Sequence, residues 1–145
     1  MYLVSSCLAG VNCRYDGKNS ENNFVIELVK QGKAVPVCPE QLGGLATPRP
    51  GCEIVKYKNA NKKVISKDGQ DFTNEFIEGA EKTLAIAKAL VVKKAILKSK
   101  SPSCGCGFIY DGTFSRELIE GNGLTAELLI KNGIEVYTEN DLDKL

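Results

Sequence analysis

The chain has 145 residues, of which 43% are hydrophobic and 26% charged, and this composition is typical of a soluble globular protein with one domain over residues 1–145. Its formal net charge of +1 predicts no broad basic surface for nucleic acid, and no apolar run reaches the roughly 20 residues of a membrane-spanning helix. The chain has no histidine, which excludes Ser-His-Asp and Cys-His catalysis as well as histidine-ligated zinc. Any bound metal would therefore be held by sulfur or oxygen.

Apolar runs and their periodicity predict strands that alternate with helices. In chain order we expect a strand at 2–6, a helix at 21–31, a strand at 34–37, a loop at 39–53, a hairpin with strands at 54–57 and 63–66, a helix at 73–91, a strand at 94–97, a loop at 99–107, a strand at 108–110, a helix at 125–131, a strand at 134–137 and a short helix at 139–145. The helix at 73–91 has the clearest pattern, because its apolar residues recur at steps of three or four. Ser20 is expected to cap the helix at 21–31, which Gly32 follows.

Strands that alternate with helices are typical of an α/β fold. We expect a mainly parallel β-sheet flanked by helices in a Rossmann-like arrangement, with the hairpin as a small insertion. Cys7, Cys38 and Cys104 each fall at, or a few residues after, the carboxyl end of a predicted strand. Because ligands bind at that edge of an open α/β sheet, these three cysteines could converge on one site.

Cysteine is the residue type that stands out most. The six cysteines are Cys7, Cys13, Cys38, Cys52, Cys104 and Cys106. The N-terminal residues lack the basic and apolar segments of a signal peptide, so we expect a cytoplasmic protein with reduced thiols. No Cys-x-x-Cys pair occurs, which argues against zinc ribbons, thioredoxin-like redox sites and the compact spacing of ferredoxins. Dispersed cysteines could still form a metal site if the fold brings them together.

The first cysteine motif is CLAGVNCRYDG, at residues 7–17. A tyrosine-phosphatase loop also follows a strand, but it needs five residues between its cysteine and its arginine, whereas six separate Cys7 from Arg14. A phosphate cradle is therefore disfavoured. The simplest alternative to a functional role is a glycine turn that contains two incidental cysteines.

The second motif is PVCPEQLGG, at residues 36–44. Pro39 stiffens the turn after Cys38, and the two glycines at its end permit close approach of the backbone to a ligand. Glu40 lies two residues past a potential metal ligand, where its carboxylate could transfer a proton, although an ordinary surface glutamate is the alternative. Arg49 could pair with Glu40 or with an anionic substrate.

The third motif is KSKSPSCGCG, at residues 98–107. Its small residues leave room for a bulky inorganic group, and its backbone N–H groups and hydroxyls could donate hydrogen bonds to cluster sulfurs. A flexible Gly/Ser loop is the alternative, which the two cysteines make less attractive.

In this order and spacing, the motifs resemble the DUF523 family of small bacterial and archaeal proteins, whose characterised members are thiouracil desulfidases. The resemblance covers essentially the whole chain. The matching segments are residues 7–17, 36–40, 43–45, 48–50, 96–98, 101–105 and 109–114. Arg116 departs from the pattern, because a glycine or another small residue is expected there.

The resemblance implies a [4Fe–4S] cluster held by only three protein cysteines, which correspond to Cys7, Cys38 and Cys104. The fourth iron, without a protein ligand, would bind the sulfur of the substrate. Glu40 and Ser101 are the best matches to the carboxylate and the serine thought to assist catalysis, with Ser99 and Ser103 close by.

The remaining polar and cysteine residues of the motifs complete the candidate site. Arg49 and Ser103 are the candidate substrate-binding residues. Cys13, Cys52 and Cys106 have no assigned role.

The function that the resemblance implies is cluster-dependent removal of sulfur from a thiolated nucleobase such as 2- or 4-thiouracil, giving uracil and hydrogen sulfide. It is a non-redox hydrolysis of a C–S bond, in the hydrolase or lyase class of sulfur metabolism. The expected partner is a small thiolated base, nucleoside or nucleotide; the lack of a basic excess makes thiolated tRNA less favoured, and no membrane partner is expected. Two alternatives are a non-catalytic Fe–S or soft-metal-binding protein and a metal-free cysteine-persulfide sulfurtransferase.

Overall fold

The computed structural model describes residues 1–57 and 61–145. Residues 58–60, at the predicted turn of the hairpin, lie outside the described residues. The elements in chain order are β1 (Tyr2–Ser5), η1 (Ser6–Ala9), α1 (Asn23–Lys30), β2 (Ala34–Val37), α2 (Pro39–Leu42), β3 (Cys52–Lys56), β4 (Lys62–Ser66), α3 (Thr73–Ala89), β5 (Lys94–Leu97), β6 (Phe108–Tyr110), β7 (Leu118–Glu120), α4 (Leu124–Lys131), β8 (Glu135–Thr138) and η2 (Leu142–Lys144), where η marks a 3₁₀ turn.

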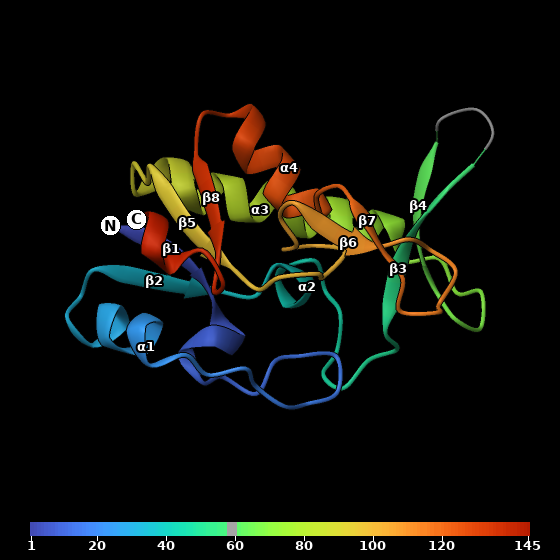
Figure 1. Ribbon diagram of the computed structural model, residues 1–145, viewed down its shortest axis with the longest axis horizontal. Helices are drawn as coiled ribbons and strands as arrows, with labels where there is room; N and C mark the ends of the chain where they lie inside the picture. The colour runs from blue at the N-terminus through green and yellow to red at the C-terminus, as the bar shows by residue number, and fades with distance from the viewer. Residues whose placement is uncertain (58–60) are drawn as a thin grey trace.

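The centre of the fold is a four-stranded sheet in the order β2-β1-β5-β8. All three strand pairs are parallel, with Leu3 opposite both Val35 and Ala95. Two antiparallel hairpins, β3–β4 and β6–β7, lie at the other end of the molecule's long axis (Figure 1). The predicted α/β class with a parallel sheet and a small hairpin insertion is confirmed.

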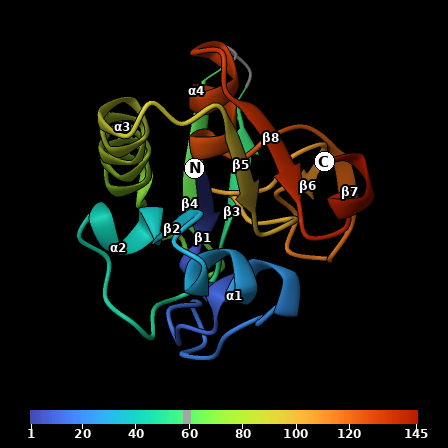
Figure 2. The same ribbon diagram turned by 90° about the vertical axis from the view of Figure 1, so that its left-hand side faces the viewer.

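Helices cover both faces of the sheet because its strands are apolar on both sides. Leu3 and Leu97 pack on the face that α3 and α4 cover, whereas Val4 and Ile96 pack on the face of α1 (Figure 2). All four side chains have no exposed surface. The strands therefore run through the core, and their carboxyl ends open toward the hairpins.

Several predicted boundaries were wrong by a few residues. The first strand ends at Ser5, where η1 begins, and α1 is capped by Asn22, whose side chain accepts a hydrogen bond from the N–H of Val25 at 3.2 Å, rather than by Ser20. The final segment forms only the short turn η2 instead of a helix over 139–145. Three elements were not predicted: the 3₁₀ turn η1, the helix α2 in the expected loop at 39–53, and the strand β7.

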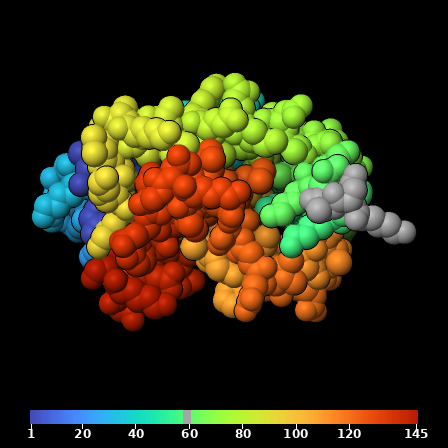
Figure 3. Space-filling view, turned by 90° about the horizontal axis from the view of Figure 1, so that it is seen from above, coloured from blue at the N-terminus to red at the C-terminus, as the bar shows by residue number. Residues whose placement is uncertain are grey.

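The sheet and the hairpins form two ends of one body, which the space-filling view shows from above (Figure 3). The sheet, with its early and late segments, occupies one end, and the segments around β3–β4 and β6–β7 occupy the other. Within the described residues, no helix is long and apolar enough to cross a membrane.

Candidate metal centre

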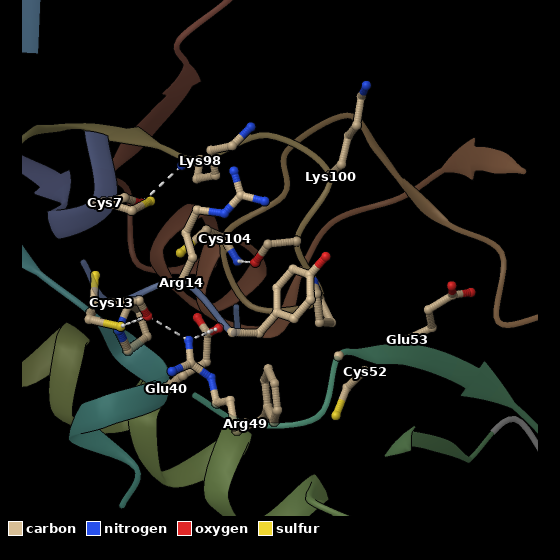
Figure 4. Close-up of a pocket in the computed structure, with 18 of the residues that line it drawn as sticks. Cys7, Cys13, Arg14, Glu40, Arg49, Cys52, Glu53, Lys98, Lys100 and Cys104 are labelled. Carbon is tan, nitrogen blue, oxygen red and sulfur yellow. Dashed lines mark hydrogen bonds and ion pairs between the residues drawn. The ribbon is translucent and has the colours of Figure 1, made fainter. Parts of the chain in front are cut away.

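A cavity of about 620 Å³ opens at the carboxyl ends of β1, β2 and β5. The segments that follow these three strands line one end of it, and β3 with the loop after β6 lines the other. Cys7, Cys13 and Cys104 lie at the first end, and Cys52 and Glu53 at the second (Figure 4). The cavity therefore joins a thiol-rich end to an end built by the hairpins.

Three cysteines reach the cavity from three different strands. Cys7 lies in η1, two residues after β1, and is 8% exposed; Cys38 directly follows β2; Cys104 lies in the loop after β5 and is 3% exposed. Each of these thiols lies near enough to another to affect its ionisation. The structure thus brings together the three cysteines that strand-end positions had singled out.

The cysteines around the cavity suit a metal cluster better than a single metal ion. Among the described residues, no three Cys, Asp or Glu side chains lie close enough together to hold a single metal ion. A four-iron cluster takes its thiolates on separate corners, so its ligands stand farther apart than those of one ion, and soft thiolates are the ligands it prefers. Cys7, Cys38 and Cys104 around a cavity of this size therefore fit a cluster, and these three would hold it.

The thiols differ in their ease of ionisation. Burial raises the pKa of Cys7 to about 11 and raises that of Cys104 well above its ordinary range. A hydrogen bond from the Cys13 thiol, the largest effect, lowers the pKa of Cys38 to about 7. Metal ligation requires thiolates, so a metal at this site would displace protons from Cys7 and Cys104 at neutral pH.

Sequence reasoning missed two polar side chains beside these thiols. Ser5 is 2% exposed, and its Oγ accepts a hydrogen bond from the N–H of Lys98 at 2.9 Å. Cys13, also 2% exposed, accepts a hydrogen bond from the Cys38 thiol at its carbonyl oxygen, at 3.7 Å. The sequence does contain a signal for Ser5, because it directly follows the apolar pair Leu3-Val4 in a predicted strand. A serine buried in such a strand needs a hydrogen-bond partner for its hydroxyl.

Glu40 and Arg49 form an ion pair at the edge of the thiol-rich end. Arg49 Nη2 lies 2.8 Å from Glu40 Oε2, and the two side chains are 5% and 16% exposed. The guanidinium also donates to the carbonyls of Cys13 and Ala46 and to the hydroxyl of Thr47. All the hydrogen bonds of the Arg49 guanidinium therefore go to protein partners. Arg49 was expected to pair either with Glu40 or with an anionic substrate, and the structure contains the pair with Glu40. Glu40 Oε1 accepts no hydrogen bond from the described residues, so one carboxylate oxygen remains available in the cavity.

Glycines set the position of the helix that carries Glu40. A Cβ added at Gly79 of α3 would lie 2.0 Å from the carbonyl oxygen of Pro39, and one at Gly43 would lie 2.0 Å from the carbonyl oxygen of Glu75. The backbones of α2 and α3 thus touch directly, with no side chain between them. This contact holds the Cys38-Pro39-Glu40 turn against the long, rigid α3.

The loop that carries Cys104 is tied to itself by Ser101. The Ser101 hydroxyl oxygen accepts hydrogen bonds from the N–H groups of Ser103 and Cys104, at 3.0 and 2.8 Å. Ser101 lines the cavity, and its hydroxyl hydrogen remains to be donated. Ser99 also lines the cavity, but its hydroxyl bonds Glu139 at 2.9 Å.

The same loop caps α4. The carbonyl oxygens of Pro102 and Ser103 accept the first N–H groups of α4, which would otherwise be unpaired. The Ser103 side chain is 1% exposed and hydrogen-bonds Thr125 at 2.8 Å, so its hydroxyl is committed to α4 rather than to the cavity. The substrate-binding role expected for Ser103 therefore has no contact to support it.

The hairpin end of the cavity is held by a buried carboxylate. Glu53 Oε1 accepts hydrogen bonds from the N–H groups of Gly112 and Phe114, at 3.0 and 3.2 Å. Arg116 also lines the cavity. Its φ of 65° is a left-handed backbone conformation, which glycine adopts most easily, and this explains why a small residue is expected at the position. Lys67 and Lys100 also line this end.

The two remaining cysteines occupy different surroundings. Cys52 lines the hairpin end of the cavity, where burial raises its pKa to about 12. Cys106 donates from its thiol to the carbonyl oxygen of Val136, on the sheet side of the Cys104 loop.

Comparison with known proteins agrees with this architecture. The family model for 2-thiouracil desulfurase matches residues 2–141. An uncharacterised protein of Bacillus subtilis (strain 168), YbbK, is 47% identical over 150 residues, which span 100% of this chain and 99% of that protein. A solved structure described as the [4Fe-4S]-dependent thiouracil desulfidase TudS, of the DUF523 group, superposes with a TM-score of 0.90 at 40% identity, covering 99% of this chain and 93% of the other. The resemblance inferred from the motifs is confirmed, and the chain belongs to the 2-thiouracil desulfurase family.

Proposed function

We propose that this enzyme is a [4Fe–4S]-dependent desulfidase that removes sulfur from a thiolated uracil, with Cys7, Cys38 and Cys104 as the cluster ligands. The observation that carries the proposal is the meeting of these three thiols, from three parallel strands, at one end of a cavity that also holds the Glu40 carboxylate. The relative described as a [4Fe-4S]-dependent thiouracil desulfidase supports the same cofactor and substrate class. The free thiols of all six cysteines suit a reducing compartment such as the cytoplasm.

When bound through three cysteines, the cluster supplies one iron with an open coordination position, a Lewis acid with affinity for sulfur. The net reaction replaces C=S with C=O, because water delivers its oxygen to the carbon and both of its protons leave with sulfur as H₂S. No electron is gained or lost.

The chain's own groups can handle the protons. Glu40 Oε1 is available to accept a proton from the attacking water, while Arg49 fixes the carboxylate through Oε2. Ser101 Oγ already accepts two backbone N–H bonds, so its O–H can donate to a heteroatom of the base.

The hairpin end favours a substrate with a negative charge. Lys67, Lys100 and Arg116 line it and make no ion pair with any described residue. By contrast, the cations nearer the thiols are paired: Arg49 with Glu40 and Lys98 with Glu139. We therefore expect a thiolated nucleotide to be preferred over the neutral base, since its phosphate could reach the unpaired cations.

The test is anaerobic reconstitution followed by assays on 2-thiouracil, 4-thiouracil, thiouridine and thiouridine monophosphate, with H₂S and the desulfurated product both measured. A brown protein with iron and labile sulfide that releases stoichiometric H₂S is expected. A brown but inactive protein would instead indicate a cluster carrier, and a colourless active one a persulfide sulfurtransferase. If the unpaired cations bind phosphate, the nucleotide should have the lower KM, and added salt should raise that KM more than that of the base.

Cysteine variants test the ligand set on the same preparations. Cys7→Ala, Cys38→Ala and Cys104→Ala should each lose most of the iron, because a three-ligand site has no protein ligand to spare. Cys106→Ala is the matched control, since Cys106 lies in the same loop as Cys104 but bonds Val136. Iron content near that of the wild type in Cys38→Ala would refute the assignment.

A further inference from the structure

We infer that Glu53 is a positioning residue for substrate specificity: its carboxylate fixes the backbone of the loop at 111–116, which presents Phe114 and Arg116 to the part of the substrate remote from the cluster. The inference rests on the proposed function, which places an anionic group of the substrate at the hairpin end of the cavity. Glu53 thus acts through the loop and not through a contact with the substrate.

Backbone conformations that most residues rarely adopt are concentrated at this end of the cavity. Among the described residues, four other than glycine have a positive φ, and three of them line the cavity: Lys100 at 70°, Phe114 at 60° and Arg116 at 65°. The fourth, Val91, follows the end of α3. A left-handed backbone is unfavourable for residues with a side chain, and such strain is found mainly at functional sites, where surrounding contacts impose it.

Glu53 imposes part of this conformation from the neighbouring strand. It lies in β3, is 9% exposed and makes no ion pair with any described residue. Its Oε1 instead accepts the N–H groups of Gly112 and Phe114, at 3.0 and 3.2 Å. Hydrogen bonds to an ionised carboxylate are stronger than those between neutral groups. The loop therefore cannot move away from β3 without leaving a buried carboxylate without its donors.

The loop also lies directly on the backbone of β3. A Cβ added at Gly112 would lie 2.6 Å from the carbonyl oxygen of Ile54 and 3.3 Å from the Cα atom of Val55. Gly112 has a φ of 90°, so the space and the backbone conformation both require glycine there. At the base of the loop, the N–H of Asp111 donates to the carbonyl oxygen of Glu117 at 2.9 Å. These contacts act together with the two hydrogen bonds to Glu53.

The loop contributes an aromatic ring and a cation to the cavity wall. Phe114 and Arg116 line the cavity, as does Lys100, which Figure 4 shows with Glu53 on the side away from Cys7. Because the attraction between a cation and an anion falls with distance and is screened by water, a displaced Arg116 would hold an anionic group more weakly. Loss of the Glu53 hydrogen bonds should therefore weaken the binding of an anionic substrate.

Two substitutions separate the position of the loop from the charge of Glu53. The negative charge of Glu53 by itself repels an anionic substrate, so its removal alone should not weaken binding. Glu53→Gln removes the charge but keeps an oxygen that can accept both N–H groups, whereas Glu53→Ala removes the charge and the acceptor together. Glu117→Ala is the matched control, because Glu117 is an exposed glutamate at the end of the same loop.

The experiment uses the reconstituted enzyme and its variants. Steady-state assays give kcat and KM for thiouridine monophosphate and for thiouracil, and calorimetric titration with uridine monophosphate gives a Kd that needs no turnover. In Glu53→Ala, we expect the KM and Kd of the nucleotides to rise about tenfold, with smaller changes in kcat and in the KM of thiouracil. Glu53→Gln should bind the nucleotides as tightly as the wild type or more tightly.

A lower melting temperature in Glu53→Ala with unchanged nucleotide affinity would show a purely structural role and overturn the inference. So would an equal rise in the KM of nucleotide and base, or the same weakening in Glu53→Gln.

If Glu53→Ala does not fold, Arg116→Gly tests the same loop, because glycine adopts the left-handed φ without strain. This variant should fold and bind uridine monophosphate about tenfold more weakly, and wild-type affinity would refute the inference. Failure of the proposed function appears separately, as a wild-type protein that binds no cluster or releases no H₂S while the uridine monophosphate titration still reports on the loop.

Discussion

Replacement of Gly79 by alanine sets two physical effects against each other. In the interior of α3, alanine is favoured over glycine by about 0.5–1 kcal/mol, because glycine loses more backbone freedom on folding. The added Cβ would, however, lie 2.0 Å from the carbonyl oxygen of Pro39, and real Cβ atoms essentially never come within 3.0 Å of another atom. The backbones of α2 and α3 would have to separate by about 1 Å.

The packing effect should win. Overpacking of a buried contact costs about 1–3 kcal/mol, which exceeds the gain in helix propensity. For a chain of this length, we expect the melting temperature to fall by roughly 2–4 °C for each kcal/mol lost. Because α2 carries Glu40 directly after Cys38, a shift of about 1 Å should also lower turnover by about 10²-fold.

Thermal melts, iron content and desulfidase turnover are measured on one preparation of Gly79→Ala. The matched control is Glu81→Ala, an exposed position in the same helix, where the same new residue meets no neighbour and should leave all three quantities near wild type. A Gly79→Ala protein that melts higher than the wild type, with full turnover, would refute the argument that backbone contact between α2 and α3 positions the site.

Three other changes probe single groups. Glu40→Gln keeps the shape that Arg49 contacts, so we expect full iron content with turnover lower by about 10²–10⁴-fold; normal turnover would exclude Glu40 as the acid–base group. In the metal-free protein, the pKa of about 7 at Cys38 predicts that iodoacetamide alkylates this thiol first, at a rate that is level above pH 7 and falls about tenfold per pH unit below it; a rate still rising toward pH 9 would contradict this. Ser103→Ala breaks a buried bond to Thr125, so it should cost stability by about 1–2 kcal/mol and leave KM unchanged, whereas a raised KM would place Ser103 at the substrate.

The main elements could be predicted because their apolar patterns are strong. The strand at 94–97 and the helix that begins at Thr73 are both buried along a regular face, and periodicity locates such segments. The strand Leu118–Glu120 was missed because all three of its residues are exposed, which leaves no alternation to detect. The four-residue helix Pro39–Leu42 was missed because one turn is too short to show a helical period.

The three candidate ligands could be predicted because a topological rule places strand ends together, whatever the intervening sequence. The orientation of a single side chain has no such rule. Ser101 and Ser103 are two residues apart in one loop, yet one lines the cavity and the other bonds Thr125. Which of them faces the substrate depends on how α4 docks onto the loop, and the loop sequence does not contain that information.

The proposed ligands follow three different strands, so the candidate site depends on the whole fold. In a Cys-x-x-Cys site, neighbouring residues place two ligands by local geometry; here Cys7, Cys38 and Cys104 meet only after β1, β2 and β5 have paired. The pairing rests on a buried apolar core, to which the side chains of Cys7 and Cys104 themselves belong. Burial then keeps the thiols of Cys7 and Cys104 protonated until a metal displaces their protons. The proposed ligands therefore sit at the edge of a substantial apolar core, whereas small zinc domains lack such a core and need their metal in order to fold.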